Sequence, residues 1–414
     1  MRRSTRDAMR EAMLAAFAAG VRAVSGEQAT AGWLRANPSQ GPVAVIALGK
    51  AAGAMARGAQ AALGARLEQG LVIAKAGHAD ADGLDPTRFR IVEGSHPVPD
   101  ALSLAAGQSL LEFIDGLSVD QPVYVLVSGG ASALVEVLAD GVTLDRLGEI
   151  NRWLLANGLP IGQMNAVRRR LSRVKGGGLA ALLAPRPVIG LLISDVEGDD
   201  PAVIGSGPLV PPPDDRLPDG LPDWLLDVLP AQATGSGQGG DPGRTSVQVI
   251  ACLDDALAAA ARQLEELGIP ARWHRQHFDG SLDAVSAAVN EALRSEPGVV
   301  HLWGGEATVI LPAQPGRGGR NQQLALQLAR DIAGEVATLV LSAGTDGTDG
   351  PTGDAGALVD NQTVERGEVE GLSLTAHLDR ADAGTYLEQT GDLLTTGPTG
   401  TNVTDLVMAW REIA

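Results

Sequence analysis

Six apolar segments of the chain are each followed by glycine-rich residues that also carry a cation, a carboxylate or a hydroxyl. The residues that follow them are 49–50, 75–78, 128–132, 194–200, 304–306 and 342–350. In open α/β sheets, ligands bind beyond the carboxyl ends of the strands. Glycine there lets the backbone approach a ligand, and a following helix presents free N–H groups to an anion. We therefore predict a site that handles phosphate and a metal; the alternative is ordinary turn chemistry.

Five aspartates in two of these loops are candidates for metal binding. Asp195, Asp199 and Asp200 share one loop, and Asp346 and Asp349 share the other. Mg²⁺ takes oxygen ligands, usually one or two carboxylates together with phosphate oxygens. The alternative is that these aspartates cap helices or form Asx turns, which we expect for at least two of the five.

The basic residues are nearly all arginine. Among 32 basic residues only Lys50, Lys75 and Lys175 are lysines. A lysine kept in such a chain marks a place that needs a compact ammonium, unless it survives by chance. Arg168 and Arg320 lie in arginine clusters with glycines close by, and an arginine fork binds phosphate or carboxylate in bidentate fashion. For Arg168 the alternative is a solvated helix face.

Short β-branched runs alternate with alanine-rich helical runs along the chain. The predicted strands are apolar throughout, as parallel strands covered on both faces should be. They span residues 43–48, 71–74, 123–127, 188–193, 247–251, 299–303 and 339–341. The helices expected between them include residues 51–63, 103–114, 254–267 and 283–294. This pattern predicts an α/β fold with doubly wound sheets.

A segment rich in proline and glycine, residues 208–243, predicts a boundary between two domains. We expect residues 1–240 to form an N-terminal, Rossmann-like parallel-sheet domain and residues 241–414 to form a smaller C-terminal α/β domain. A chain of 414 residues exceeds what one core organises. Leu14, Phe17, Val21 and Val24 fall on one helical face, which predicts an amphipathic docking helix rather than a targeting peptide.

The overall charge and the cysteine content exclude several classes of protein. A net charge of −18 repels nucleic acid and anionic lipid, so neither is an expected partner. The only cysteine is Cys252, so no intrachain disulfide can form, and a reducing, cytoplasmic compartment is expected. No apolar run approaches 18 residues, so no membrane span is expected. No Walker A loop and no GxGxxG turn follows the first predicted strand, so neither a P-loop nor a dinucleotide fold is signalled.

Eleven motifs, taken together and in order, resemble those of the glycerate 2-kinase family, which joins an N-terminal DUF4147-type domain to a C-terminal MOFRL domain. They are LGKAA at 48–52, EGSHPVPD at 93–100, SGGASAL at 128–134, NAVR at 165–168, SRVKGGGLA at 172–180, ISDVEGDD at 193–200, GSGP at 205–208, GGE at 304–306, GGRNQ at 318–322, GTDGTDGPT at 344–352 and GPTGTNV at 397–403. The resemblance runs over nearly the whole chain. It implies two α/β domains with the active site in the interdomain cleft, with ATP, Mg²⁺ and D-glycerate as ligands and 2-phosphoglycerate as product.

The resemblance points to Lys50 and Arg320 as the catalytic basic residues. Phosphoryl transfer depends on positioning and charge neutralisation, so we expect both to neutralise the transferring phosphoryl group or the glycerate carboxylate. Asp195 is predicted to orient or deprotonate the 2-hydroxyl, and Asp346 and Asp349 to hold Mg²⁺, with an exchange of these roles left open. The residues predicted to bind substrate or phosphate are Ser128, Gly129, Gly130, Ser132, Asn165, Arg168, Lys175 and Asn321.

Three positions depart from the family pattern. Gln323 stands where Glu is usual, Asp382 where Asn is common, and prolines 211–213 where Asp and Thr are usual. Gln323 matters most because it removes a charge beside Arg320. Two other functions stay open: an oxidoreductase acting on hydroxypyruvate, a label that some relatives carry, and a non-catalytic nucleotide-binding protein. The sequence does not fix the oligomeric state, for which a homodimer is considered.

Overall fold

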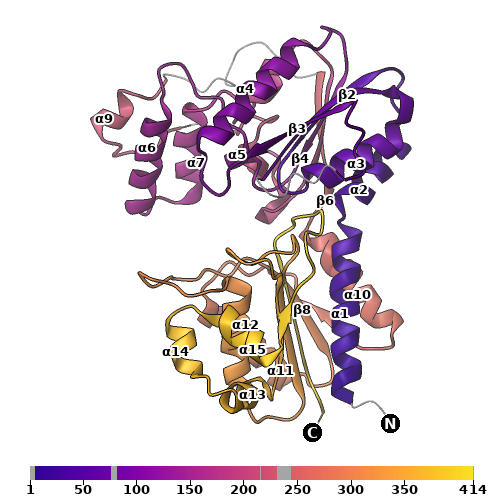
Figure 1. Ribbon diagram of the computed structural model, residues 1–414, viewed down its shortest axis with the longest axis vertical. Coiled ribbons are helices and arrows are strands. Elements are labelled where there is room, and N and C mark those ends of the chain that lie inside the picture. The colour runs from indigo at the N-terminus through magenta and orange to yellow at the C-terminus, as the bar shows by residue number, and fades with distance from the viewer. Residues whose placement is uncertain (1–4, 76–81, 215, 231–243, 414) are drawn as a thin grey trace. The chain divides into compact units, whose positions relative to one another are not determined.

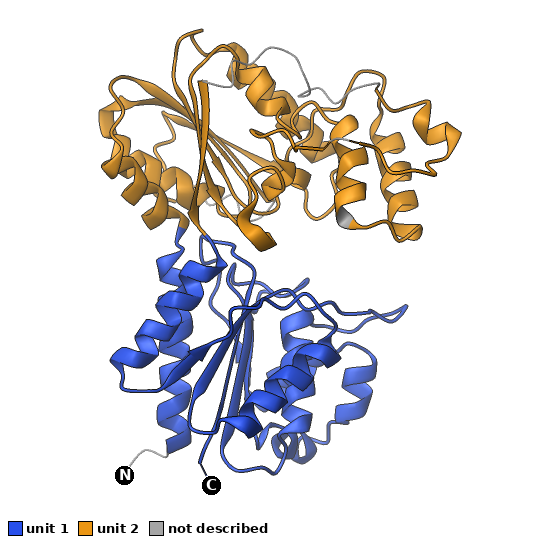
Figure 2. Cartoon of the chain, turned by 180° about the vertical axis from the view of Figure 1, so that it is seen from behind, with its two compact units in different colours: residues 1–25, 252–414 blue, residues 26–251 orange. Residues whose placement is uncertain are grey.

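The computed structural model describes residues 5–75, 82–214, 216–230 and 244–413. The chain divides into two compact units, which Figure 2 distinguishes by colour: unit 1 comprises Met1–Ser25 and Cys252–Ala414, and unit 2 comprises Gly26–Ala251. Each unit has its own six-stranded sheet. Residues 76–78 of one predicted loop and residues 231–243 of the predicted boundary lie outside the described residues.

Unit 2 carries the first six strands of the chain (Figure 1). Its elements are α2 (Gly26–Ala36), β1 (Val43–Leu48), α3 (Ala52–Leu63), η1 (Gly64–Arg66), β2 (Leu67–Lys75), β3 (Phe89–Gly94), α4 (Ala101–Asp115), β4 (Val123–Val127), α5 (Ala131–Leu134), α6 (Leu144–Ala156), α7 (Ile161–Arg170), α8 (Gly178–Leu183), β5 (Val188–Ile193), η2 (Glu197–Asp199), η3 (Ile204–Ser206), α9 (Asp223–Leu226) and β6 (Thr245–Ala251).

The sheet of unit 2 is parallel throughout, in the order β3-β2-β1-β4-β5-β6. Helices cover both of its faces. Ala44, Ile46 and Leu48 of β1 face a core shared with α4 and α8, whereas α3 contacts β1 and β2. This confirms the predicted doubly wound, Rossmann-like fold. The strand order reverses between β1 and β4, and ligands bind at such a switch point in this class of fold.

A helical extension of unit 2 has its own small core. It is built from α6, α7 and α9, and Leu147, Ile150, Leu154, Val167 and Leu225 are buried in it. Thr143 begins α6, because its hydroxyl accepts a hydrogen bond from the backbone N–H of Arg146 at 3.3 Å. In this extension, α6 and α7 lie beside the loop that follows the carboxyl end of β4. The predicted ligand-binding loops of unit 2 lie at this edge of the sheet.

Unit 1 combines the first helix of the chain with its C-terminal part (Figure 1). Its elements are α1 (Thr5–Ala23), α10 (Leu253–Glu266), β7 (Ala271–Trp273), α11 (Leu282–Ser295), β8 (Val300–Gly305), α12 (Arg320–Asp331), β9 (Thr338–Gly344), β10 (Gly356–Asp360), α13 (Thr363–Val369), α14 (Leu374–Asp379), α15 (Ala383–Thr390), β11 (Leu393–Leu394) and β12 (Asp405–Arg411).

The sheet of unit 1 is mixed, in the order β11-β10-β9-β12-β8-β7. The central strand β12 runs antiparallel to both β8 and β9. All of β9 and nearly all of β12 is buried. The apolar runs therefore predicted burial on both faces correctly, but burial does not determine strand direction. In the described part of the chain, no helix combines the length and apolar character that a membrane span requires.

The two units do not follow the predicted division at residue 240. The N-terminal helix α1 packs on α10 of unit 1, and a Cβ on Gly20 would lie 2.9 Å from the carbonyl oxygen of Ala256. Thr401 further holds the end of this helix, since its hydroxyl donates to the Val24 carbonyl at 2.6 Å. Strand β6 lies beyond residue 240 but pairs with β5, so it completes the sheet of unit 2. The predicted helix is thus present and packs through a face that includes Met13 and Phe17, whereas Leu14 and Val21 of the predicted face are only partly buried.

Candidate functional site

Lys50 and Ser128 follow the two strands between which the strand order of unit 2 reverses. The Lys50 backbone N–H donates to the Gly129 carbonyl at 2.9 Å, and the Ser128 N–H donates to the Leu48 carbonyl at 2.9 Å. These bonds join the loop after β1 to the loop after β4. The sheet topology therefore brings Lys50, Ser128, Gly129 and Gly130 together, as the sequence predicted for a ligand site.

Two glycines allow these loops to approach each other. Gly49 has φ +120°, and a Cβ at this position would lie 2.3 Å from the Ser128 hydroxyl oxygen. Gly130 has φ +81°, and a Cβ there would lie 3.1 Å from the His96 ring and 3.3 Å from Lys50 Cγ. Side chains are strained at positive φ, so glycine is required at both positions. His96, which belongs to the EGSHPVPD motif, thus lies near Lys50.

Ser128 has a structural task in this arrangement. Its side chain is fully buried, and its hydroxyl accepts a hydrogen bond from the Ala51 N–H at 2.9 Å. Ala51 precedes the first residue of α3, so Ser128 satisfies one of the free N–H groups at the start of that helix. Ser132 is the hydroxyl of the same loop that is partly exposed.

Ser132, Arg168 and Lys175 line one pocket of unit 2, with a volume of about 290 Å³. Its other lining residues are Pro97, Val98, Pro99, Ala133, Glu136, Leu147, Asn151, Leu155 and Ser206. Asn165 is linked to this group, because Arg168 Nη1 donates to its side-chain oxygen at 3.5 Å. The fold therefore brings Ser132 together with three predicted binding residues of the later segment 165–175.

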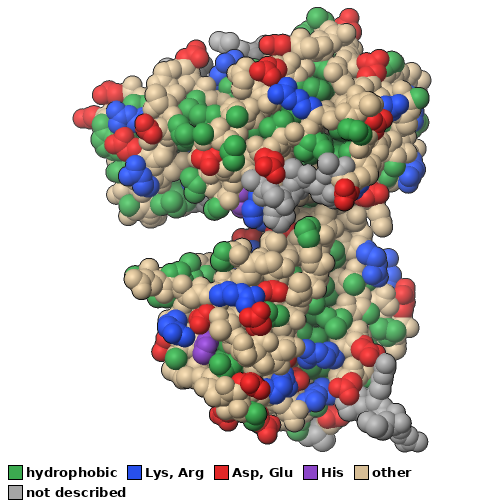
Figure 3. Space-filling model, in the orientation of Figure 1, with side chains coloured by type: hydrophobic (Ala, Val, Ile, Leu, Met, Phe, Trp, Pro, Cys, Tyr) green, Lys and Arg blue, Asp and Glu red, His purple; other side chains and the backbone are tan. Residues whose placement is uncertain are grey.

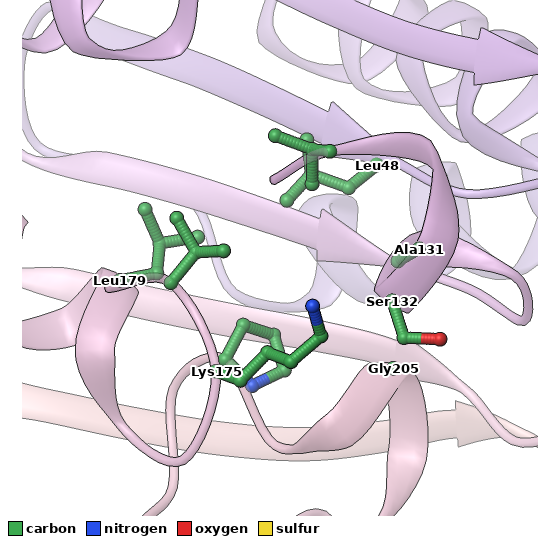
Figure 4. A pocket seen from close by; sticks show the side chains of 9 residues that line it. Leu48, Ala131, Ser132, Lys175, Leu179 and Gly205 are labelled. Atoms are coloured by element: carbon green, nitrogen blue, oxygen red, sulfur yellow. The ribbon is translucent and has the colours of Figure 1, made fainter. Parts of the chain in front are cut away.

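Lys175 forms a buried ion pair within this group. Its Nζ pairs with Oε2 of Glu136, and Oε1 of the same carboxylate accepts a hydrogen bond from the Ser172 hydroxyl at 2.5 Å. Lys175 also borders a second cavity of about 10 Å³, room for about one water molecule. Figure 4 shows the Lys175 side chain extending toward the short helix that carries Ala131 and Ser132. Glu136 neutralises Lys175, which therefore does not provide a free positive charge.

Asp195 lies just beyond the carboxyl end of β5, next to β4 in the sheet. It is partly exposed. The preceding residue, Ser194, fixes the turn because its hydroxyl donates to the Val196 carbonyl at 3.2 Å. Asp195 therefore lies at the same edge of the sheet as Lys50, where its predicted role requires it.

Arg320 begins α12 in unit 1 and contacts two carboxylates. Its Nε donates to Asp405 Oδ2 at 2.5 Å, and its Nη2 donates to Glu306 Oε1 at 2.8 Å. Burial disfavours the guanidinium charge, but the two carboxylates more than offset this and raise the pKa of Arg320. Arg320 is thus permanently charged and held at the edge where β8 and β9 end and β12 begins.

Asp349 binds the N-terminus of α12. Its Oδ1 accepts from the Asn321 N–H at 3.1 Å, and its Oδ2 accepts from the Gln322 N–H at 2.8 Å. Asn321, a predicted binding residue, also accepts a hydrogen bond from Ser342 at 2.7 Å through its side-chain oxygen. Burial, together with the charge of Asp405, raises the pKa of Asp349 to about 7. Both oxygens of Asp349 are occupied by the helix, which is the capping alternative considered for these aspartates.

Asp346 and Asp405 are two further carboxylates near this loop. An Oδ1 atom of each lies 3.4 Å from the point where a Cβ on Gly344 would be, and the Thr348 carbonyl oxygen lies 2.7 Å from the same point. Asp346 Oδ1 also accepts from the N–H of Thr348 at 2.9 Å. Among the described residues, no three His, Cys, Asp or Glu side chains gather as a metal site. Two carboxylates are nevertheless what Mg²⁺ usually takes from protein when phosphate supplies other ligands.

Three carboxylates that pair with the predicted basic residues were not identified from the sequence. Glu136 stands alone in the apolar run 133–139, and a charge in such a run indicates a buried ion pair. Glu306 ends the GGE motif, so it was visible as a strand-end residue without an assigned role. Asp405 gave no comparable signal, because only its position across the sheet from β9 brings it to Arg320.

Gln323 and Asp382, two residues that depart from the family pattern, both form specific hydrogen bonds in the structure. Gln323 is buried, and its Nε2 donates to the Leu378 carbonyl at 2.9 Å. An amide donates this bond and a carboxylate does not, so Gln323 serves the packing of α12 on α14. Asp382 Oδ1 accepts from the Arg317 N–H at 2.9 Å and from the Thr385 hydroxyl at 2.7 Å. It thus fixes the loop that leads into Arg320.

The two units are α/β folds that gather cations and carboxylates at the ends of their strands. The model of a domain of unknown function, DUF4147, matches residues 12–217, and the model of the MOFRL family matches residues 299–405. The chain is 32% identical over 393 residues to the glycerate 2-kinase of Pyrococcus horikoshii, covering 89% of this chain and 87% of that protein. It is 34% identical over 388 residues to the D-glycerate 2-kinase of Thermotoga maritima, covering 88% and 90%.

Comparison of structures agrees with these relatives. The crystal structure of glycerate kinase from Thermotoga maritima superposes with a TM-score of 0.81 at 31% identity, covering 98% of this chain and all of that one. An Agrobacterium vitis protein provisionally named a hydroxypyruvate reductase is 37% identical over 387 residues, covering 88% of this chain and 98% of that protein. The chain belongs to the glycerate kinase family that combines a DUF4147 domain with a MOFRL domain.

Proposed function

We propose that the protein is a kinase that transfers the γ-phosphoryl group of ATP to the 2-hydroxyl of D-glycerate, giving 2-phosphoglycerate and ADP. The observation that carries this proposal is the meeting of Lys50 with the Ser128–Gly130 loop at the switch point of a parallel sheet, in a chain whose relatives are named glycerate 2-kinases. A backbone rich in glycine beside a lysine is suited to bind a phosphoryl group.

In the proposed reaction, Asp195 accepts the proton of the glycerate hydroxyl while that oxygen attacks the γ-phosphorus. The bond from this phosphorus to the bridging oxygen of ADP breaks, and the electron pair leaves with ADP. Lys50 and Arg320 are proposed to offset the negative charge of the transferring group, which is the main demand of this reaction. The acceptor bond and the leaving bond must be held in line, so positioning is the protein's other contribution.

The proposed cofactor Mg²⁺ would be held by Asp346 together with Asp405. When bound, it would neutralise charge on the phosphate oxygens of ATP. We assign Asp349 the task of holding the start of α12, and thereby Arg320 and Asn321, instead of the metal. Asp346→Asn is expected to weaken Mg²⁺-dependent binding of ATP, whereas Asp349→Asn is expected to lower thermal stability.

Phosphorus NMR of the product made from ATP, Mg²⁺ and D-glycerate tests the reaction and the position of the phosphoryl group. A 2-phosphoglycerate signal is expected, and Lys50→Ala and Arg320→Ala are each expected to reduce its rate of formation by orders of magnitude without unfolding the chain. Arg330→Ala is the control, because Arg330 is an exposed arginine on the same helix as Arg320, paired only with its neighbour Asp331. Near-normal rates in both active-site variants would remove the proposed roles.

A second candidate function is reduction of hydroxypyruvate, favoured by the name of the Agrobacterium vitis relative. The loop after β1 begins with Gly49-Lys50 and lacks the GxGxxG pattern expected for a nicotinamide dinucleotide. A spectrophotometric assay with NADH and hydroxypyruvate separates the two functions. Oxidation of NADH without formation of a phosphorylated product would favour the reductase.

The remaining proposals concern the setting of the enzyme. We propose a cytoplasmic location, supported by a single cysteine in 414 residues and by the absence of a membrane-spanning helix from the described residues. The proposed partners are ATP and D-glycerate, and a homodimer is the assembly to test by light scattering after size-exclusion chromatography.

A further inference from the structure

Arg168 is a partly buried cation that has only neutral partners. Its Nε donates to the side-chain oxygen of Asn151 at 2.9 Å, and its Nη1 donates to that of Asn165 at 3.5 Å. Among the described residues, no carboxylate forms an ion pair with it. Burial lowers the pKa of Arg168, with no neighbouring negative charge to oppose that effect. A desolvated guanidinium of this kind is costly unless an anion completes its surroundings.

The other charges of the same pocket cancel. Lys175 and Glu136 both line it, but they pair with each other. The pocket therefore carries the single unbalanced positive charge of Arg168, in a chain whose net charge is −18. The side-chain amides of Asn151 and Asn165 orient the guanidinium without neutralising its charge. Its remaining N–H donors can therefore bind a ligand.

We propose that this pocket binds the carboxylate of a small hydroxy acid through Arg168, with Asn151 and Asn165 as positioning residues. The inference rests on the proposed kinase function to the extent that D-glycerate is the first ligand it names. It goes further by assigning the carboxylate to unit 2 and to Arg168, which leaves Lys50 for the phosphoryl group.

The size and lining of the pocket favour a small acid over a nucleotide. A volume of about 290 Å³ is at the lower end of small-molecule pockets. One guanidinium matches one carboxylate, whereas a triphosphate needs several cations or a metal. Val98 and Leu155 are exposed apolar residues that also line this pocket, and Figure 3 shows hydrophobic side chains gathered on the part of unit 2 that carries α6 and α7. Such a wall would exclude water from a short carbon chain.

Backbone strain marks the same place. Ser206 lines the pocket with φ +66°, between Gly205 and Gly207, whose φ values are +57° and +63°. The N–H of Gly176 donates to the Ser206 carbonyl at 3.0 Å, which fixes this strained turn against the segment that carries Lys175. Residues with side chains in this region of conformational space cluster at ligand sites. The Ser206 and Ser132 hydroxyls are thus available on the pocket wall to hydrogen bond a hydroxy group.

The pocket continues from the loop that holds Lys50. His96 and Lys50 Cγ both lie within 3.3 Å of the point where a Cβ on Gly130 would be. Pro97, the next residue after His96, lines the pocket, and so does Ser132, two residues after Gly130. An acid bound by Arg168 would therefore present its hydroxyl toward the loop at which phosphoryl transfer is proposed.

Titration calorimetry of the full-length protein with D-glycerate, in the absence of ATP, tests this inference. Arg168→Ala is expected to weaken binding by about 10- to 100-fold, because a charge-assisted bidentate contact is lost. Asn151→Asp is the sharper variant: it places a carboxylate where an amide oxygen now lies 2.9 Å from Arg168 Nε. We expect the new carboxylate to form an ion pair with Arg168. D-glycerate binding should then weaken by at least tenfold without a lower melting temperature. Arg152→Ala, which removes the same charge from the exposed side of α6, is expected to leave affinity unchanged.

The possible results separate this inference from the proposed function. Unchanged D-glycerate affinity in both Arg168→Ala and Asn151→Asp overturns the inference while leaving the kinase intact. Weakened ATP binding with unchanged D-glycerate binding also overturns it, since the pocket would then hold the nucleotide. Binding of lactate or hydroxypyruvate that depends on Arg168, without binding of D-glycerate, supports the pocket and removes the glycerate kinase. Failure of the wild-type protein to bind any of these acids overturns the inference.

Discussion

Lys175→Met is predicted to destabilise unit 2, and the double variant with Glu136→Leu is predicted to recover most of the loss. The side chains of Lys175 and Glu136 are only 6% and 2% exposed, and they pair directly. Ser172 supplies one further hydrogen bond to the carboxylate, at 2.5 Å. In the single variant this buried carboxylate loses its paired cation, so its burial becomes costly.

The expected magnitudes follow from that geometry. Removing one partner of a buried pair costs about 3–5 kcal/mol of unfolding free energy. Replacing both partners by apolar side chains of similar size removes the stranded charge, and the hydrogen bond between Ser172 and Glu136 is then lost, at about 1–2 kcal/mol. The double variant should therefore be about 2–3 kcal/mol more stable than the single variant.

Hydrogen–deuterium exchange at increasing urea concentration measures these values in peptides from α5 and α8. This readout is needed because a chain of two units has no single free energy of unfolding. The control is Arg90→Met, which breaks an ion pair with Glu112 whose two side chains are each 51% exposed; it should cost less than about 1 kcal/mol. If Lys175→Met costs no more than this control, or if the double variant is no more stable than the single one, the reasoning is refuted. Lys175 would then be free to bind substrate directly.

The structure also predicts the direction in which three further changes alter stability or turnover. Gly49→Ala forces a Cβ to within 2.3 Å of the Ser128 hydroxyl at φ +120°, so it should cost about 2 kcal/mol or more in thermal unfolding and reduce turnover. Burial lowers the pKa of His274 and His301, whose rings hydrogen bond at 3.0 Å, so both favour the neutral form when folded. Stability from this pair is complete above their unfolded pKa of about 6.5 and is lost as the pH falls below it; His301→Asn should flatten that slope in urea titrations at pH 7.5 and 5.5. Thr404 is a β-branched residue at φ +73°, so Thr404→Gly should raise stability by about 1 kcal/mol while slowing turnover, and a lower melting temperature would contradict this.

The parallel sheet of unit 2 could be predicted because its strands follow a local rule. A strand such as Val43–Leu48 is apolar at every position, since both faces of the sheet are covered, and the glycine at its end marks the turn toward a ligand site. Lys50 and Ser128 were found by that rule alone. The direction of β12 and the placement of α1 follow no local rule, because each depends on a partner far away in the sequence.

The pairing of charged residues likewise cannot be predicted from local sequence. Arg168 and Lys175 belong to one basic cluster and both line one pocket, yet only Lys175 has a carboxylate partner, because Glu136 reaches it from the end of a different segment. The sequence contains both residues and no information on which cation is neutralised. That difference underlies the role proposed for Arg168, since only an unbalanced cation adds net attraction for an anionic ligand.

Asp349 and Asp405 illustrate how hydrogen-bond partners change the role that is proposed for a carboxylate. Both are buried carboxylates near the start of α12, and Asp349 stands in the loop whose composition indicates a metal. However, the two oxygens of Asp349 accept backbone N–H groups of the helix, whereas both oxygens of Asp405 accept side-chain hydrogen bonds from Arg320. A carboxylate whose two oxygens accept backbone hydrogen bonds would have to release the start of the helix before it could bind a cation. The metal role that we propose therefore goes to Asp346 and Asp405, on the basis of backbone donors that no composition rule reveals.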